Sequence, residues 1–403
     1  MEKSILEKKL IEIHHILESN YHKEKDIGAL SGLSGISLFY FYYSKYLNID
    51  SDIGLDIISN CIDKINTNYD YPTFCTGIAG LAWVCDHLEK EKFIEIDNDI
   101  LLSGFDDYLY KAMINDFKKN NYDFLHGGIG YAFYFLTRYE NTSSKRLKNK
   151  YQDILLEVIY YLRKLSEKEG ENKIKWASII DRDTNEQGYN LSLSHGMSSI
   201  IGILTKLHEK ESFKEATSPL LKGAINYILS FKNLEEKDVS VFPDTIPRTD
   251  KKLDYNSRLA WCYGDLGIGI RLWFAAKTLN NEELKATAIS ILKHTALRVD
   301  KKETKVLDAS ICHGSYGNAQ IFNRMYKETN IKEFKTATNF WIQDGINKAI
   351  HKDGYAGYKQ LKGNKGNWES ETNLLEGVAG IGLVIIDYLS DFDSNWDTCL
   401  MIS

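Results

Sequence analysis

The stretch "TGIAGLAWV", residues 76–84, places two glycines three positions apart and follows them with an apolar run. The same arrangement, G-x-x-G before apolar or aromatic residues, recurs along the chain and is typical of a repeat protein. The leading glycines of the seven copies are Gly32, Gly77, Gly127, Gly196, Gly264, Gly314 and Gly377. Their spacings of 45, 50, 69, 68, 50 and 63 residues leave room for two helices and two turns in each repeat.

Two kinds of helix are expected in each repeat. The segment after a motif is apolar on all sides, as in "ISLFYFYY" from Ile36, which indicates a buried inner helix. The segment between motifs is amphipathic, and an outer helix over residues 147–165 would bury one face. The residues of that face are Tyr151, Ile154, Leu155, Val158 and Leu162. We therefore predict an all-α fold, an α/α toroid of seven helical hairpins forming one domain over residues 1–403, with an irregular helical bundle as the alternative.

Two long intervals between motifs are polar, at residues 166–190 and 231–257. Each contains a short run with the composition of a strand, "IKWASII" at 174–180 and "VSVFP" at 239–243. We interpret these intervals as insertions that pack together beside the ring as a small extension containing β-structure.

The composition limits the classes of function. A net charge of −6 gives no indication of nucleic-acid binding, and no apolar run reaches the length of a membrane span. The charged N-terminal segment lacks the apolar core of a signal peptide, so a cytoplasmic location is expected. The six cysteines are too few and too scattered for a disulfide framework, so those that matter should act as thiolates or metal ligands.

Two cysteines occupy the same register in adjacent repeats. Cys262, in "WCYGD", lies two positions before Gly264, and Cys312, in "CHG", lies two positions before Gly314. A toroid would bring these neighbouring turns together, and His313 would add an imidazole nitrogen. Two thiolates and one imidazole suit Zn²⁺. Cys75 has the same register but belongs to a repeat across the ring, so we predict three protein ligands and an open, catalytic position.

Three further polar residues fall in repeats close to the predicted zinc site. His195 immediately precedes Gly196, Asp123 lies four positions before Gly127, and Arg258 lies four positions before Cys262. We expect all three to be catalytic residues at one end of the ring. Structural roles are the alternatives, since Asp123 could cap a helix and Arg258 could brace a loop through a salt bridge.

With these residues assembled, the sequence resembles the lanthipeptide cyclases, the LanC family, and in particular its free-standing class I members. The resemblance covers all seven repeats and is carried by "RLAWCYGDLGIG" (258–269), "CHGSYGNA" (312–319), "SHGM" (194–197), "YDFLHGG" (122–128) and "LLEGVAGIG" (374–382). It implies an α/α toroid with one Zn²⁺ on Cys262, Cys312 and His313. It also implies a dehydrated precursor peptide as substrate, with a separate dehydratase and an export transporter as partners at the inner membrane face.

The implied reaction joins a peptide cysteine to dehydroalanine or dehydrobutyrine and gives (methyl)lanthionine thioethers. Few thiols are ionised near neutrality, and zinc binding deprotonates a coordinated thiol. The sulfur attacks the β-carbon, and an acid must then protonate the α-carbon. His195 is the expected acid, Asp123 would orient it or help to deprotonate the thiol, and Arg258 would brace the site or stabilise the enolate oxygen.

Rival functions remain open. A LanC-like enzyme that adds glutathione to dehydrated proteins would have the same zinc site, and a degenerate cyclase could persist as a non-catalytic peptide-binding scaffold. The zinc set of protein prenyltransferases includes an aspartate, so the Cys-Cys-His set argues against that class. A glycosidase toroid would need paired carboxylates, and Asp123 has no evident partner in that role.

Overall fold

Each of the seven glycine motifs leads directly into an α-helix in the computed structural model, which describes residues 3–49, 51–181, 183–233, 239–362 and 366–403. The leading glycine is the N-cap of its helix in every case. These motif helices are α2 (Leu33–Leu47), α4 (Ile78–Lys90), α7 (Gly128–Asn141), α9 (Met197–His208), α11 (Asp265–Thr278), α14 (Ser315–Thr329) and α16 (Val378–Leu389). In α4 every residue from Ile78 to Leu88 is buried, as the apolar sequence predicts.

The remaining helices divide between two units of the chain. Unit 1 comprises Met1–Ile94 and Lys305–Ser403, and unit 2 comprises Glu95–Thr304. Unit 1 also holds α1 (Lys3–Asn20), η1 (Tyr21–Lys23), α3 (Ile53–Asn66), α15 (Lys332–Asn347) and η3 (Trp396–Leu400). Unit 2 also holds α5 (Asn98–Leu101), η2 (Leu102–Gly104), α6 (Asp106–Lys118), α8 (Lys145–Leu165), α10 (Glu211–Leu229), α12 (Glu282–Leu297) and α13 (Lys301–Thr304).

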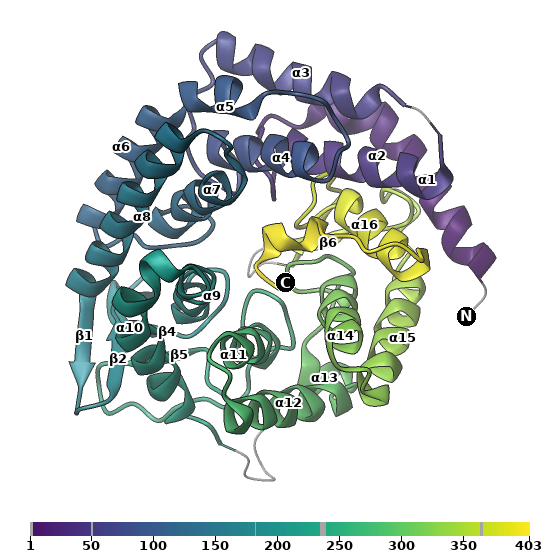
Figure 1. Cartoon of the computed structure of the whole chain (residues 1–403). Helices are drawn as coiled ribbons and strands as arrows, with labels where there is room; N and C mark the ends of the chain where they lie inside the picture. Colours follow the sequence, from purple (N-terminus) through teal and green to yellow (C-terminus); the bar gives the residue numbers. More distant parts are fainter. Residues whose placement is uncertain (1–2, 50, 182, 234–238, 363–365) are drawn as a thin grey trace. The chain divides into compact units, whose positions relative to one another are not determined.

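Most motif helices pack against an amphipathic partner helix of the same unit. In unit 1, α2 packs on α3, α14 on α15 and α16 on α1; in unit 2, α7 packs on α8, α9 on α10 and α11 on α12 (Figure 1). The buried face of α8 contains all five predicted residues, Tyr151, Ile154, Leu155, Val158 and Leu162. The helical-hairpin repeat predicted from the sequence is therefore present in each unit.

The second glycine of a motif allows the helix to approach the turn that precedes it. A Cβ atom on Gly80 would lie 2.0 Å from the carbonyl oxygen of Phe74, and one on Gly317 would lie 1.9 Å from that of Ile311. Ser199 takes this place in α9, where its hydroxyl donates to the carbonyl oxygen of Gly196 at 2.7 Å. The absence of a Cβ is thus a packing requirement at Gly80 and Gly317, whereas α9 carries a side chain at the corresponding position.

Backbone hydrogen bonds connect the turns of neighbouring repeats. The acceptor is the carbonyl of the residue two positions before a leading glycine. Cys75 O accepts from Leu30 N and Ser31 N, and Leu375 O accepts from Ile311 N and Cys312 N. In unit 2, Cys262 O accepts from Leu193 N and Ser194 N. Since these bonds involve the main chain, they hold the turns in place whatever side chain the acceptor residue carries.

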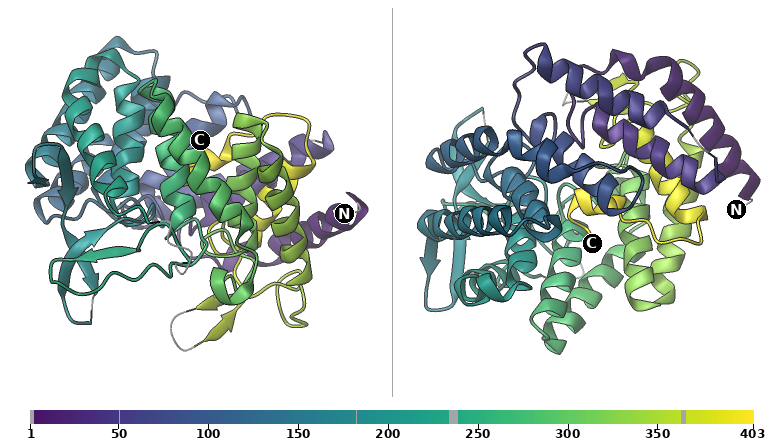
Figure 2. Two further views of the ribbon diagram at one scale, coloured as in Figure 1. Left: turned by 90° about the horizontal axis from the view of Figure 1, so that it is seen from below. Right: turned by 45° about the horizontal axis from the view of Figure 1, so that its top comes forward.

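The β-structure is confined to short strands. They are β1 (Ser166–Glu169), β2 (Lys173–Trp176), β3 (Ser178–Asp181), β4 (Glu186–Asn190), β5 (Thr245–Pro247), β6 (Gln360–Lys362) and β7 (Asn367–Glu369). Antiparallel β1–β2 follows directly from α8, with β2 packed against α10 (Figure 2). In a three-stranded sheet, β4 pairs with both β3 and β5, so residues of the two polar intervals meet. Residues 182, 234–238 and 363–365 lie outside the described residues.

The predicted strand "IKWASII" is confirmed as parts of β2 and β3, but the strand predicted at "VSVFP" is wrong. The strand of the second interval is β5, which begins two residues later, at Thr245. The N–H groups of Val241 and Phe242 donate to the buried carboxylate of Asp265, at 3.0 and 2.9 Å, and so are taken up by a side chain. A carboxylate at the start of α11 therefore replaces the strand partner that this apolar run would otherwise need.

Among the described residues, no helix combines the length with the apolar composition that crossing a bilayer requires.

The close approach at the second glycine can be tested with Gly80→Ala. The added methyl group would overlap the carbonyl of Phe74, so we expect the free energy of unfolding to fall by about 1–3 kcal/mol. Gly104→Ala is the matched control, because a Cβ there meets no atom within 4 Å. Urea-induced unfolding of both variants measures the difference, and equal stability of the two would contradict the packing argument.

Candidate active site

Cys312 and His313 occupy the turn that leads into α14 in unit 1. Cys312 is partly exposed, and the side chain of His313 is 18% exposed, so both are accessible at the N-terminus of a buried helix. Nε2 of His313 lies 3.0 Å from Oδ2 of Asp308, a buried carboxylate. Burial alone would raise the pKa of Asp308, but its hydrogen bonds and the charge of His313 lower that pKa to about 2. Asp308 is therefore a negatively charged partner that orients the imidazole.

Cys262 occupies the equivalent turn before α11 in unit 2. Its side chain is buried, and its carbonyl oxygen accepts hydrogen bonds from the loop before α9. Gly264 adopts a left-handed backbone with φ of 85°, where a Cβ would lie 2.4 Å from the carbonyl oxygen of Arg258. Glycine is therefore needed two positions after Cys262 to close this turn. A thiolate here would gain from the N-terminal dipole of α11.

Asp123 and His195 are brought together in unit 2, although 72 positions separate them in the sequence. Oδ2 of Asp123 lies 2.6 Å from Nδ1 of His195, while Oδ1 accepts from the backbone N–H groups of Leu125 and His126 at 2.7 and 2.9 Å. Burial raises the pKa of Asp123, but the hydrogen bond and charge of His195 outweigh it, and the pKa falls below its ordinary value. An ionised Asp123 fixes the tautomer and the direction of the His195 ring.

This pair lies in a cleft of unit 2 with a volume of about 1010 Å³. Asp123, His195 and Tyr263 line one part of the cleft, and residues of β3, including Ser178 and Ile179, line another. A cleft of this size can hold a drug-sized ligand or several residues of a peptide. An imidazole oriented by a carboxylate at the edge of such a cleft can donate a proton to a bound substrate.

Arg258 is exposed, and it is not among the described residues that line this cleft. Its charge instead acts on Asp244, which lies just before β5. Burial raises the pKa of Asp244 to about 6, with hydrogen bonding to Ser257 and the charge of Arg258 opposing the rise. The structure therefore places Arg258 near a partly buried carboxylate of its own unit, and its expected role toward an enolate stays a prediction.

Two residues that contact predicted site residues, each within its own unit, were not predicted from the sequence. Asp308 binds His313, and the ring of Tyr263 lies 6.1 Å from that of His195, centroid to centroid. Tyr263 directly follows Cys262, so its place in the sequence could have indicated that it lies near the predicted site. In the sequence, Asp308 is only a charged residue before the mostly uncharged "ASICHG" segment. Nothing local indicates that His313 is its partner.

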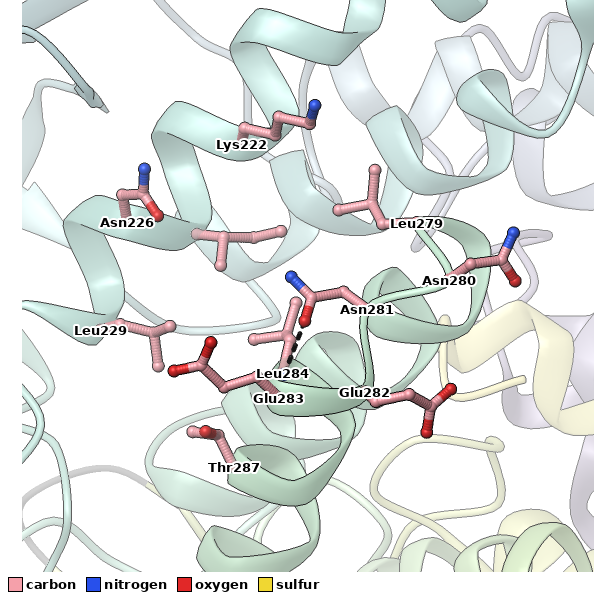
Figure 3. A pocket seen from close by; sticks show the side chains of 11 residues that line it. Lys222, Asn226, Leu229, Leu279, Asn280, Asn281, Glu282, Glu283, Leu284 and Thr287 are labelled. Atoms are coloured by element: carbon pink, nitrogen blue, oxygen red, sulfur yellow. Dashed lines mark hydrogen bonds between the residues drawn. The ribbon is translucent and has the colours of Figure 1, made fainter.

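A separate groove of about 600 Å³ lies between α10 and α12 (Figure 3). Its lining includes Lys222 and Asn226 of α10 and Glu283 of α12, and Asn281 caps α12 by accepting from Leu284 N at 3.0 Å. No cysteine or histidine is among the residues that line it, so it offers none of the chemistry expected of the candidate site.

The chain belongs to the family of lanthionine synthetase C-like proteins, whose family model matches residues 24–401. A curated relative, the nisin biosynthesis protein NisC of Lactococcus lactis subsp. lactis, is 24% identical over 353 residues, which are 81% of this chain and 76% of the relative. The solved structure of a nisin cyclase aligns with a TM-score of 0.76 at 21% identity, covering 100% of this chain and 98% of that one. This likeness confirms the predicted fold class, the α/α toroid of helical hairpins with a small β-containing insertion.

The Asp123–His195 pair makes stability depend on pH. Because the folded-state pKa of Asp123 lies below its ordinary value of 3.8, its ionised form stabilises the fold above that value, and the contribution disappears as pH falls through the folded pKa. We expect Asp123→Asn to lose more stability relative to wild type at about pH 6 than at about pH 3. Urea unfolding at both pH values measures this difference.

Asp116→Asn gives a control of opposite sign. Burial raises the pKa of Asp116, so its ionised form opposes folding. As pH falls, the free energy of unfolding of wild type should therefore rise relative to that of Asp116→Asn. If the two variants showed the same trend with pH, the assignment of the Asp123–His195 hydrogen bond as one that stabilises the ionised carboxylate would be wrong.

Proposed function

We propose that this protein is a zinc-dependent peptide cyclase that adds cysteine thiols to dehydroalanine or dehydrobutyrine and forms (methyl)lanthionine rings. The observation that carries the proposal is the Asp123–His195 hydrogen bond beside a large cleft, in a chain of the lanthionine synthetase C-like family. The names of the similar proteins, a nisin biosynthesis protein and a nisin cyclase, support a peptide substrate of the same chemistry.

The proposed metal ligands are Cys262, Cys312 and His313. Support comes from their chemistry and from their register, since both cysteines lie two positions before the leading glycine of a motif helix. His313 already has the carboxylate partner that metal-binding histidines usually have, in Asp308. The residues therefore fit a zinc ion. When bound, zinc would lower the pKa of a coordinated peptide thiol and so supply a thiolate near neutral pH.

The protein side chains would carry out the proton transfer. As the peptide sulfur bonds to the β-carbon of the dehydro residue, negative charge moves to the enolate oxygen and the α-carbon requires a proton. His195 would donate that proton from Nε2, because Asp123 occupies Nδ1 and holds the ring in one orientation. Arg258 is proposed to stabilise the enolate oxygen or to brace the site.

The substrate in this proposal is a precursor peptide whose serines and threonines have already been dehydrated. The cleft beside Asp123 and His195 would receive the segment that contains the reacting residues. A separate dehydratase would supply this peptide and an export transporter would remove the product. These two partners, and a cytoplasmic site of action near the inner membrane face, are proposed from the resemblance to the family.

Zinc content is the first measurement. We expect one tightly bound zinc per wild-type chain and its loss in Cys312→Ala, because removing one of three ligands greatly weakens a zinc site. Metal analysis of purified protein measures the ratio, and circular dichroism checks that the variant is folded. A wild type without zinc, in protein never exposed to a chelator, would contradict the proposed function.

The zinc measurement needs a background variant, because α1 carries a second group of metal-binding side chains. Ligand atoms of His14, His15 and Glu18 lie within 4.8 Å of one another, and His15 and Glu18 are exposed. Both proteins should therefore carry His15→Ala, so that adventitious zinc on the surface of α1 does not add to the count.

The proton donor can be tested with His195→Asn. We expect cyclisation of a dehydrated precursor peptide to slow by about 10²–10⁴-fold while zinc content stays at the wild-type level. His294→Asn is the matched control, since this histidine lies on α12 of the same unit and does not line the cleft. Mass spectrometry after thiol alkylation counts the rings formed. Full cyclisation by a folded His195→Asn would remove His195 as the acid.

The same assay distinguishes the rival functions. Incubation of the dehydrated peptide with glutathione would give an adduct of increased mass if the protein transfers that thiol, whereas cyclisation leaves the mass unchanged. A protein that binds the peptide but shows no zinc-dependent turnover would favour the scaffold function.

A further inference from the structure

Asp308 is a buried carboxylate whose two oxygens are used in different ways. It is 1% exposed, and Oδ1 accepts from the backbone N–H and the hydroxyl of Ser310, at 2.9 and 2.8 Å. Oδ2 accepts from the N–H of Leu361 in β6 at 3.1 Å and lies 3.0 Å from Nε2 of His313. Asp308 thus connects the turn before α14 to the β6–β7 hairpin within unit 1.

These contacts determine which nitrogen of His313 carries a proton. Oδ2 of Asp308 lies 3.0 Å from Nε2 of His313, and a carboxylate oxygen accepts but does not donate, so Nε2–H is the donor of this hydrogen bond. The lone pair of the neutral ring then resides on Nδ1. Metals bind a histidine through the nitrogen that carries the lone pair, and the opposite N–H usually donates to a carboxylate or carbonyl.

We infer that Asp308 is a positioning residue that holds His313 as the Nε2–H tautomer and presents Nδ1 to the metal. This inference rests on the proposed zinc-dependent function. It adds to that function the carboxylate that orients one ligand and the nitrogen through which the ligand binds.

Gly314 makes this arrangement sterically feasible. A Cβ atom at Gly314 would lie 2.5 Å from Oδ1 of Asp308 and 2.2 Å from Ser310 N. The turn can therefore close over the carboxylate only if a glycine follows His313. The close order of Cys312, His313 and Gly314 in the sequence then has two reasons, which are entry into α14 and access of Asp308 to the ring.

Asp308→Asn tests the inference with a nearly isosteric change. The amide has one acceptor oxygen and one donor group, so it cannot accept from Ser310, Leu361 and His313 in the present arrangement. We expect zinc affinity, measured by competition with a chromophoric chelator, to weaken by about 10–100-fold. Asp387→Asn is the matched control, because Asp387 is a buried carboxylate of α16 in the same unit that binds Gln320, Asn323 and Lys327.

The direct readout is the tautomer of His313 in the zinc-free wild type. Nitrogen NMR of histidine-labelled protein, assigned with His313→Asn, should show a protonated Nε2 and a lone pair on Nδ1. The opposite tautomer would overturn the inference even if Asp308→Asn failed to fold. A purely structural role for Asp308 would leave zinc affinity equally reduced in Asp308→Asn and Asp387→Asn.

The outcomes separate this inference from the proposed function. If wild type contains no zinc, or if Cys312→Ala contains as much zinc as wild type, the zinc-dependent function fails. If wild type binds that zinc and folded Asp308→Asn binds it equally tightly, only the role of Asp308 is overturned. A selective loss of affinity in Asp308→Asn, with the predicted tautomer, supports both.

Discussion

The backbone carbonyl two positions before a leading glycine is the acceptor on which the arrangement of neighbouring turns depends. Cys75 O, Cys262 O and Leu375 O each accept two N–H groups from the turn of an adjacent repeat, and Leu30 O accepts from Leu375 N. Buried N–H and C=O groups must be paired, so a loop displaced from this register would leave several polar groups without partners. Gly28 and Gly80 let these backbones approach, because a Cβ on Gly28 would lie 2.3 Å from Cys75 O and one on Gly80 would lie 2.4 Å from Ala29 N.

The position two residues before a leading glycine can carry a reactive side chain without disturbing the fold. Leu30, Cys75, Cys262, Cys312 and Leu375 all occupy it. The main chain of such a residue serves the structure, while its side chain is free to be apolar or to be a thiol. A cysteine can therefore be introduced at a helix N-terminus, where a thiolate is favoured, at little cost to the connection between repeats.

Local patterns predict local structure here, and non-local contacts set the limit. All seven motif helices begin at the residue after the leading glycine, because the signal lies within each motif. The strand predicted at "VSVFP" is absent because Asp265, more than twenty positions later, takes the N–H groups of Val241 and Phe242. Register suggested that Asp123 and His195 belong to one site, but their hydrogen bond and the role of Asp308 depend on distances that no local pattern encodes.

Unit 1 is assembled from both ends of the chain, with α16 packed against α1 and α2, whereas unit 2 is continuous from Glu95 to Thr304. During synthesis all of unit 2 is therefore translated before the second half of unit 1. At translation rates of about 5–20 residues per second, the first helices wait roughly 17–70 s for α16. Throughout that interval the apolar faces of α1 and α2 have no partner from the C-terminal half, so the nascent N-terminal segment is where chaperone protection would be most needed.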